Sequence, residues 1–240
     1  MLKVENISTG YGKKQVLFDI SFEVNKGDIV LLAGSNGSGK SSLLKAIFGL
    51  LPLWHSANTI GAIGAVIFNG ENIAGKPTSV LLEKGLLYIP QKNNLFEDLT
   101  VKENLEMAGL SLDKKKLQHR IENTLTLFTS LVQHRNRTPM KMSGGERQLL
   151  TLAMATLHEP KLLLIDEPFT GLSPQNITFV ADNLKALNVN NGITLLIVEH
   201  RVKECTRIAN KVIGLKLGRV FSKGEVNKTF DVNSLNQVFV

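Results

Sequence analysis

The alternation of hydrophobic and polar positions predicts two kinds of strand. In the segment 18–24 the even-numbered residues are apolar and the odd-numbered ones are polar, which is typical of a strand with one face in water. The segment 29–33 is apolar throughout, and 162–165 and 193–198 are of the same type, as expected of parallel strands buried on both faces. We therefore expect an α/β protein with a mostly parallel sheet and an N-terminal antiparallel strand region.

A different spacing in the middle of the chain predicts helices. Apolar residues in the segment 117–128 recur every three or four positions, with charged residues among them, so they fall on one helical face. No buried strand is evident between 101 and 158, whereas apolar pairs and glycines after Lys211 predict strands or a hairpin. We therefore expect one domain, 1–240, with a core at 1–91 and 159–215, an inserted helical subdomain at about 92–158 and a C-terminal extension at about 216–240.

Composition indicates the cellular compartment and the kinds of partner more clearly than it indicates the function. Lys and Arg number 28 against 21 Asp and Glu, a net charge of +7, which suits nucleic acid, anionic headgroups, an acidic partner or simply a Lys-rich soluble surface. The single cysteine, Cys205, excludes an intrachain disulfide and a cysteine-rich zinc site, so we expect a buried apolar residue in a reducing cytoplasm. The N-terminus lacks a signal-peptide core, and the apolar stretches are shorter than the ~20 residues of a membrane helix. Any membrane role would come through a partner or the surface.

A phosphate-binding loop is predicted at GSNGSGKS, residues 34–41, between an apolar strand and an amphipathic helix. The segment fits the P-loop pattern G-x-x-x-x-G-K-[ST], in which glycines let backbone N–H groups point at phosphate oxygens and the helix N-terminus adds positive potential. Lys40 is expected to reach the β- and γ-phosphates and Ser41 to ligate Mg²⁺. The alternative is a glycine-rich turn that fits by chance, which the flanking segments disfavour. The predicted nucleotide-binding residues are Gly34, Ser35, Asn36, Gly37, Ser38, Gly39, Lys40, Ser41 and Ser42.

Two acids end the apolar segment KLLLIDEP, residues 161–168. Because a parallel strand delivers its carboxyl end to the sheet edge where the P-loop also lies, we expect Asp166 to hold Mg²⁺ through a water. Glu167 is expected to point the other way along the pleat and to polarise the attacking water, and a general base contributes roughly 10²- to 10⁴-fold in rate. The alternative is a pair of solvated acids at a strand end.

Three isolated residues are further candidates. His200 follows the apolar segment 193–198 and can contact the γ-phosphate, or hold the water and Glu167. The neutral amide of Gln91 can touch Mg²⁺ and water together, and Tyr11, expected in a loop between two strands, can stack on a purine for about 1–3 kcal/mol. Taken alone, each of the three also fits a structural role. The other histidines, His55, His119, His134 and His158, are expected to be structural.

A second anion clamp is predicted at MSGGERQ, residues 142–148, where Ser143, Gly144 and Gly145 open a helix. In chain order, Tyr11, GSNGSGKS, Gln91, MSGGE, LLLIDEP and VEH resemble the ATP-binding-cassette (ABC) ATPase family over essentially the whole chain. In that family two cassettes pair head to tail, and the SGG loop of one closes on the ATP held by the other. The resemblance implies ATP and Mg²⁺ as cofactors, Tyr11 on the adenine, Ser41, Gln91 and Asp166 at the metal, and Glu167, His200 and Gln91 in catalysis.

Some segments depart from the family pattern. Met142 and Glu146 replace the ends of the usual LSGGQ, which should keep the glycine clamp. Ser173, followed by Pro174, stands where many members have an aspartate in a loop that crosses the dimer interface. The segment 52–64 is also longer than the usual connection.

The sequences of four segments resemble one branch of the family. YIPQKNNLFEDLTVKENL, SGGERQLL, EPFTGLSP and IVEH resemble the ATPase subunits of branched-chain amino acid importers, and lipopolysaccharide-export ATPases have a similar layout. The resemblance implies a second ABC ATPase subunit, identical or related, and transmembrane permease subunits. It places the chain at the cytoplasmic face of the inner or plasma membrane, peripheral through its partners. We expect 92–99 and nearby helical residues to form the groove for a coupling helix.

Two other classes of function stay open as alternatives. Soluble ABC proteins that act on DNA or ribosomes usually carry long coiled coils, cysteine-rich insertions or two cassettes per chain. Here the segment between Gln91 and Ser143 has no cysteine, and the chain has one cassette, so no direct nucleic-acid contact is expected. A regulatory module that binds ATP without cleaving it is disfavoured by Glu167.

Overall fold

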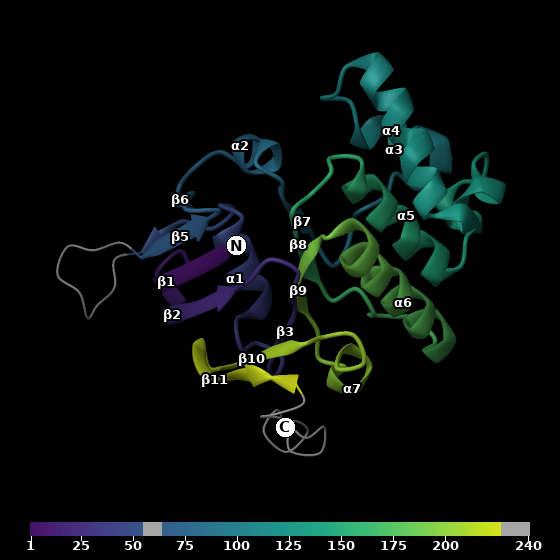
Figure 1. Cartoon of the computed structure of the whole chain (residues 1–240). Coiled ribbons are helices and arrows are strands. Elements are labelled where there is room, and N and C mark those ends of the chain that lie inside the picture. The colour runs from purple at the N-terminus through teal and green to yellow at the C-terminus, as the bar shows by residue number, and fades with distance from the viewer. Residues whose placement is uncertain (55–63, 227–240) are drawn as a thin grey trace.

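The computed structural model describes residues 1–54 and 64–226. Most of the long 52–64 connection, including His55, lies outside the described residues, as does the end of the C-terminal extension, 227–240. Figure 1 shows two sheets and a group of helices beside them. Within the described residues, no helix combines the length and the apolar character needed to cross a bilayer.

The first sheet is the mostly parallel one that the apolar segments predicted. Its strand order is β11-β10-β3-β9-β8-β7, with all neighbours parallel except the hairpin β10–β11. The strands are β3 (Ile29–Ala33), β7 (Leu86–Ile89), β8 (Leu162–Asp166), β9 (Thr194–Val198), β10 (Lys211–Lys216) and β11 (Arg219–Glu225). The hairpin predicted after Lys211 is thus confirmed for its described part.

The second sheet is antiparallel and comes from the N-terminal part of the chain, as predicted. Its long strands run side by side in Figure 1, and Phe18 N donates to Gly218 O (2.8 Å), which joins this sheet to the hairpin of the first. The strands are β1 (Leu2–Tyr11), β2 (Lys14–Val24), β4 (Leu53–Trp54), β5 (Ala65–Phe68) and β6 (Glu71–Asn72).

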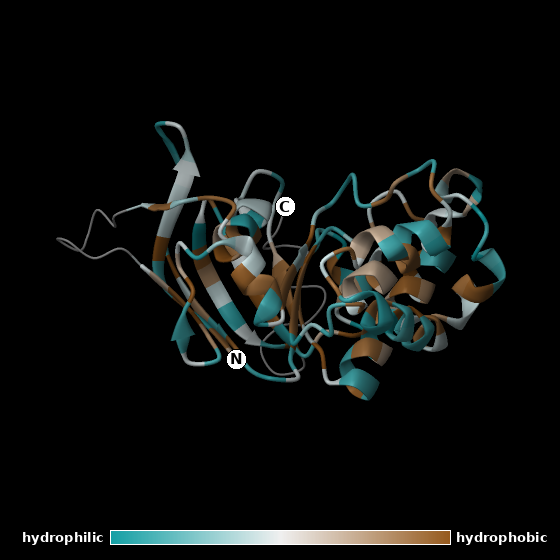
Figure 2. Cartoon of the chain, turned by 90° about the horizontal axis from the view of Figure 1, so that it is seen from above, coloured by the Kyte–Doolittle hydropathy of each residue, from teal (hydrophilic) through white to brown (hydrophobic). Residues whose placement is uncertain are grey.

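Two hydrophobic clusters explain why β3 is apolar at every position. Val30 and Leu32 pack with α1 (Lys40–Ile47) and the antiparallel sheet, whereas Leu31 and Ala33 pack with the helices on the opposite face. Both faces of the strand are therefore removed from water. Figure 2 shows hydrophobic residues, in brown, along the interior strands and hydrophilic residues, in teal, in many surface loops.

The helices predicted in the middle of the chain are present. The predicted amphipathic helix is α4 (Lys114–Leu127), whose residues Ile121 and Leu125 are buried. Between 101 and 158, where every residue is described, there is no strand, and α3, α4 and α5 lie on the side of the molecule away from β1 and β2 (Figure 1). The remaining helices are α2 (Thr78–Glu83), α3 (Val101–Ala108), η1 (Thr129–His134), η2 (Pro139–Lys141), α5 (Gly144–Thr156), α6 (Pro174–Asn191) and α7 (Val202–Cys205).

Candidate functional site

The carboxyl edge of the parallel sheet brings most of the predicted site residues together. Strands β3, β9, β8 and β7 are neighbours in that order. The loop 34–41 follows β3, His200 follows β9, Asp166 ends β8, and Gln91 follows β7. Ligand sites of open α/β sheets lie at this edge, so the topology itself gathers segments that are far apart in the sequence.

The loop 34–41 turns too tightly for side chains at two of its glycines. A Cβ on Gly34 would lie 2.2 Å from Leu215 O, and one on Gly39 (φ +104°) would lie 2.6 Å from Leu17 Cδ2. Lys40 Nζ donates to Gly34 O (2.8 Å) and Ser35 O (3.0 Å), so the ammonium lies folded over the loop. Burial lowers the pKa of Lys40, and the nearby carboxylates of the site oppose that shift.

Unsatisfied donors in this loop fit a phosphate. Ser38 is buried, and its Oγ has no hydrogen-bond partner within the described part of the chain. Helix α1 begins at Lys40 without a side-chain cap, so its first backbone N–H groups point toward the loop as donors. A triphosphate would accept hydrogen bonds from these donors and would bring the ammonium of Lys40 a better partner than two carbonyls.

Asp166 is held by two hydroxyl groups. Ser41 Oγ donates to Asp166 Oδ1 (2.9 Å) and Tyr88 Oη donates to Oδ2 (3.3 Å). Burial raises the pKa of Asp166, and the two hydroxyl donors oppose the shift. Burial also raises the pKa of Tyr88, with the charge of Asp166 adding to it. The sequence analysis did not predict a role for Tyr88. Its position in β7, the strand that pairs with β8, could have indicated that it lies near Asp166.

The oxygen atoms of Ser41 and Asp166 are of the type that Mg²⁺ prefers. Among the described residues, no group of three or more His, Cys, Asp or Glu side chains is arranged to hold a metal ion alone. Ser41 and Asp166 would supply protein ligands to Mg²⁺, which is usually bound by few carboxylates together with substrate phosphates.

Glu167 is oriented by a turn and not by the strand, so the expectation that it points along the pleat is wrong. Strand β8 ends at Asp166, and Glu167 has a left-handed backbone (φ +49°) with its N–H donating to Val198 O (2.9 Å). Its Oε2 accepts hydrogen bonds from Thr170 Oγ1 (2.9 Å) and Gln91 Nε2. His200 Nδ1 lies 3.8 Å from the same oxygen. Gln91, Glu167 and His200 are thus adjacent.

Tyr11 is the last residue of β1, so the expectation that it lies in a loop is wrong by one position. Its side chain is exposed, and its Oη lies 3.2 Å from Ser42 Oγ at the start of α1. The ring is therefore beside the phosphate loop and open to a stacking partner.

The SGG loop begins α5 away from the phosphate loop. Ser143 is the N-cap residue, and it forms a capping box with Glu146: Glu146 N donates to Ser143 Oγ (3.3 Å) and Ser143 N to Glu146 Oε2 (2.8 Å). A Cβ on Gly145 would lie 2.9 Å from Asn176 Cγ, so the loop packs on the start of α6. Over the described ranges, no hydrogen bond or ion pair joins 143–145 to 34–42. In the described part of the chain, the clamp and the cradle therefore have no direct polar link.

Residues predicted to be structural have contacts inside the protein. His119 bonds Asn123, and His158 bonds Ala108 O. His134 is buried, with Nε2 2.8 Å from Glu146 Oε1, a contact to the SGG helix that the sequence did not indicate. Cys205 is buried, as predicted, and Ser173 caps α6 by accepting from Asn176 N (3.4 Å).

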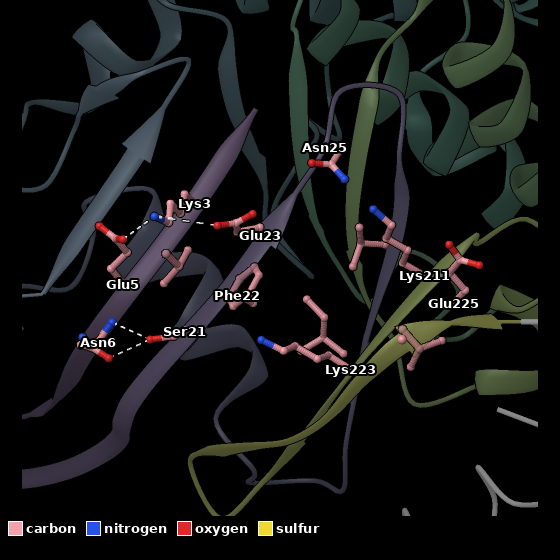
Figure 3. Close-up of a pocket in the computed structure, with 15 residues that line it drawn as sticks. Lys3, Glu5, Asn6, Ser21, Phe22, Glu23, Asn25, Lys211, Lys223 and Glu225 are labelled. Carbon is pink, nitrogen blue, oxygen red and sulfur yellow. Dashed lines mark hydrogen bonds and ion pairs between the residues drawn. The ribbon is translucent and has the colours of Figure 1, made fainter. Parts of the chain in front are cut away.

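A separate groove of about 480 Å³ lies between β1 and β2 of the antiparallel sheet and β3, β10 and β11 of the parallel one. Figure 3 shows its polar side chains turned toward one another: Lys3 pairs with Glu5 and Glu23, and Asn6 pairs with Ser21. None of the predicted nucleotide residues lines it. The groove is therefore separate from the nucleotide site.

Comparison with known proteins agrees with this geometry. Residues 17–170 match the family model described as ABC transporter. The chain is 37% identical to the high-affinity branched-chain amino acid transport ATP-binding protein BraG of Pseudomonas aeruginosa, covering 92% of this chain and 91% of BraG. It is 36% identical to the probable branched-chain amino acid transport ATP-binding protein LivF of Archaeoglobus fulgidus, covering 96% and 94%.

A solved structure has the same fold. The crystal structure of the ADP conformation of an ATP-binding cassette of an ABC transporter superposes with a TM-score of 0.87, at 25% identity over 100% of this chain and 98% of that chain. The fold and the site therefore define a P-loop ATPase of the cassette type. The chain belongs to the ABC transporter family. It is an ATP-binding and ATP-hydrolysing subunit of a transporter.

Proposed function

We propose that ATP is bound between two cassettes, cradled by 34–41 of one and capped by 143–145 of the other. The observation that supports this most is the separation of the two donor groups: the SGG loop packs on α6 of its own chain and makes no hydrogen bond or ion pair with its own cradle among the described residues. Both groups begin a helix, and a helix N-terminus favours an anion. A second chain brings such a terminus to the open side of the triphosphate.

The residues at the sheet edge divide the chemistry between them. Lys40 and the backbone of 34–41 bind the β- and γ-phosphates, and Tyr11 stacks on the adenine. Ser41, Asp166 and Gln91 would hold Mg²⁺, which neutralises charge on the phosphates when it is bound.

Glu167 is the proposed general base, because its Oε2 already accepts hydrogen bonds and lies at the site edge. The attacking water gives a proton to this oxygen as the oxygen of the water bonds to the γ-phosphorus. The bond between the γ-phosphorus and the β–γ bridging oxygen breaks, and ADP leaves with its electron pair. His200 donates to the γ-phosphate, where negative charge concentrates.

The closing and opening of the dimer drive a membrane permease. An apolar groove of about 410 Å³ lies where the end of α1, α2, β7 and α5 meet, and it suits an amphipathic coupling helix from a permease. Residues that line it include Phe48, Leu82, Tyr88, Pro90, Asn94 and Met154. Asn94 belongs to the predicted docking segment 92–99, and Tyr88 reaches from this groove to Asp166, which connects the docking surface with the site.

Branched-chain amino acid import is the transport function we propose, because both reported relatives carry that description at 36–37% identity. The chain would then lie at the cytoplasmic face of the inner or plasma membrane, held there by its permease. Lipopolysaccharide-type export remains the second candidate on the resemblance of the layout. Purification of the complex from detergent extracts identifies the permease. Leucine uptake by vesicles that contain the complex distinguishes amino acid import from lipopolysaccharide-type export.

Glu167→Gln tests the ATPase part of the proposal. The variant is expected to bind ATP with unchanged affinity, to lose turnover by at least about 10²-fold, and to form a stable dimer with ATP in sedimentation experiments. Glu122→Gln, the same change on the exposed face of α4, serves as the control with wild-type behaviour. Wild-type turnover in Glu167→Gln would contradict the assignment of Glu167 as the general base. A variant that stays strictly monomeric with ATP bound would contradict the proposed ATP site between two cassettes.

A further inference from the structure

A fully buried carboxylate that the proposed chemistry does not use lies next to His200. Glu199 directly follows β9 and has no exposed surface. An ionised carboxylate in such a position is costly unless its oxygens are hydrogen-bonded. Within the described residues, no Lys or Arg forms an ion pair with it.

Backbone N–H groups from two loops satisfy this carboxylate. Phe169 N donates to Glu199 Oε1 (2.9 Å), and His200 N and Arg201 N donate to Oε2 (2.9 and 3.1 Å). Phe169 belongs to the loop that follows Glu167, and it is itself fully buried. One oxygen of Glu199 therefore holds the loop of the proposed base, and the other holds the loop of His200.

The same carboxylate also lies beside the imidazole. His200 Nδ1 is 3.6 Å from Glu199 Oε2 and 3.8 Å from Glu167 Oε2, so one nitrogen of the ring lies near both carboxylates. Burial raises the pKa of Glu199, whereas the three N–H donors and His200 oppose that shift. Two acceptors beside the same nitrogen favour the ring orientations in which Nδ1 faces them.

We propose that Glu199 is a positioning residue for ATP hydrolysis: it fixes the loop of His200 against the loop that follows Glu167 and keeps the imidazole directed at the site. This inference rests on the proposed function of His200 and Glu167. Glu199 itself touches neither nucleotide nor water in this scheme. Its effect is expected in the rate of turnover and not in the affinity for ATP.

Glu199→Gln is the variant that tests the proposal, because it keeps the volume and removes one acceptor. An amide has one oxygen, so it can satisfy either Phe169 N or the N–H groups of His200 and Arg201, and one loop is released. We expect kcat to fall at least about tenfold, as when a positioning partner is lost, with the Kd for ATP within about twofold of wild type. Glu204→Gln, the same charge change on the short helix α7, is expected to behave as wild type.

The imidazole resonances of the five histidines give a readout that a loss of stability would not move. In protein labelled at the histidine rings, Glu199→Gln should shift the His200 signal, assigned with His200→Ala, and leave the others in place. If Glu199→Gln fails to fold, Glu199→Asp is used, which keeps two oxygens but has a shorter reach.

Two results would overturn the positioning role: unchanged kcat, or a fall in kcat with an unmoved His200 signal. Wild-type turnover in His200→Ala would instead remove the proposed role of His200, and the positioning role with it.

Discussion

Replacing Glu146 by alanine should destabilise the protein more than the same change at Glu103. Both residues close a capping box, Glu146 with Ser143 on α5 and Glu103 with Thr100 on α3. Only Glu146 also contacts a buried side chain, because its Oε1 lies 2.8 Å from Nε2 of His134. A carboxylate can only accept, so Nε2 carries the proton in this contact.

The magnitude follows from the groups left without a partner. Removal of a capping interaction costs about 0.5–2 kcal/mol, and a buried donor left unpaired costs about 1–3 kcal/mol more. The Nδ1 atom of His134 already lacks a partner among the described residues, so the ring would keep only the long contact of Nε2 with Gln133 Nε2 (3.4 Å). Because the side chain of Glu146 is 27% exposed, water can reach the gap, and we expect the lower half of the second range.

Urea or thermal unfolding measures the difference between the two variants. For a chain of this size, about 1 kcal/mol corresponds to a shift of roughly 2–4 °C in Tm. Glu146→Gln is the matched control: its amide oxygen can still accept from Ser143 N, so the capping part of the loss should be recovered. Equal destabilisation by Glu146→Ala and Glu103→Ala would refute the role assigned to His134.

The pH dependence gives a second check. The N–H of Ser143 is the main cause that holds the pKa of Glu146 below its ordinary value of 4.5. A carboxyl group whose pKa is lower in the folded state adds stability above the unfolded pKa and loses it as the pH falls through the folded one. The gap in stability between wild type and Glu146→Ala should therefore be full at pH 7 and shrink below about pH 4.5. A gap that persists unchanged into strong acid would contradict this reasoning.

Two further outcomes can be measured on the same protein. Gly218→Ala should lower Tm much more than Gly192→Ala. Both glycines have positive φ, but a Cβ on Gly218 would lie 2.0 Å from Val16 O, whereas a Cβ on Gly192 meets nothing within 4 Å. Similar losses in Tm would argue against the close approach at Gly218. Burial raises the pKa of the Cys205 thiol well above its usual range, so an aromatic disulfide reagent at pH 8 should react roughly 100-fold more slowly with native than with unfolded protein. Comparable rates would show that α7 opens readily.

Features that depend on local chemistry were predictable from the sequence. The P-loop is one continuous segment whose glycines and lysine are required by phosphate binding itself. Strand β3 was predictable because burial on both faces leaves no position for a polar residue. The capped start of α5 follows equally from Ser143 and Glu146 at the spacing of a capping box.

Features that depend on distant packing were not predictable. A charged residue directly after a buried strand suggests a solvated end, and only the fold brings Phe169 N to Glu199, 30 residues away. Tyr88 is 78 residues from Asp166, and the period of a strand indicates the face of a side chain but not its partner. The left-handed backbone of Glu167 directly follows the strand, and the alternation of a strand cannot indicate such a turn.

The three carboxylates at this sheet edge differ in the donors that hold them, and the donors account for three separate roles. Hydroxyl groups hold Asp166, and Asp166 and Ser41 together would supply oxygen ligands to Mg²⁺. A hydroxyl and an amide hold Glu167, whose oxygen stays at the edge where water arrives. Backbone N–H groups, which cannot turn away, hold Glu199 and make it a fixed link between loops. Different environments of similar acids in one site are consistent with the roles that we propose for them, as metal ligand, base and support.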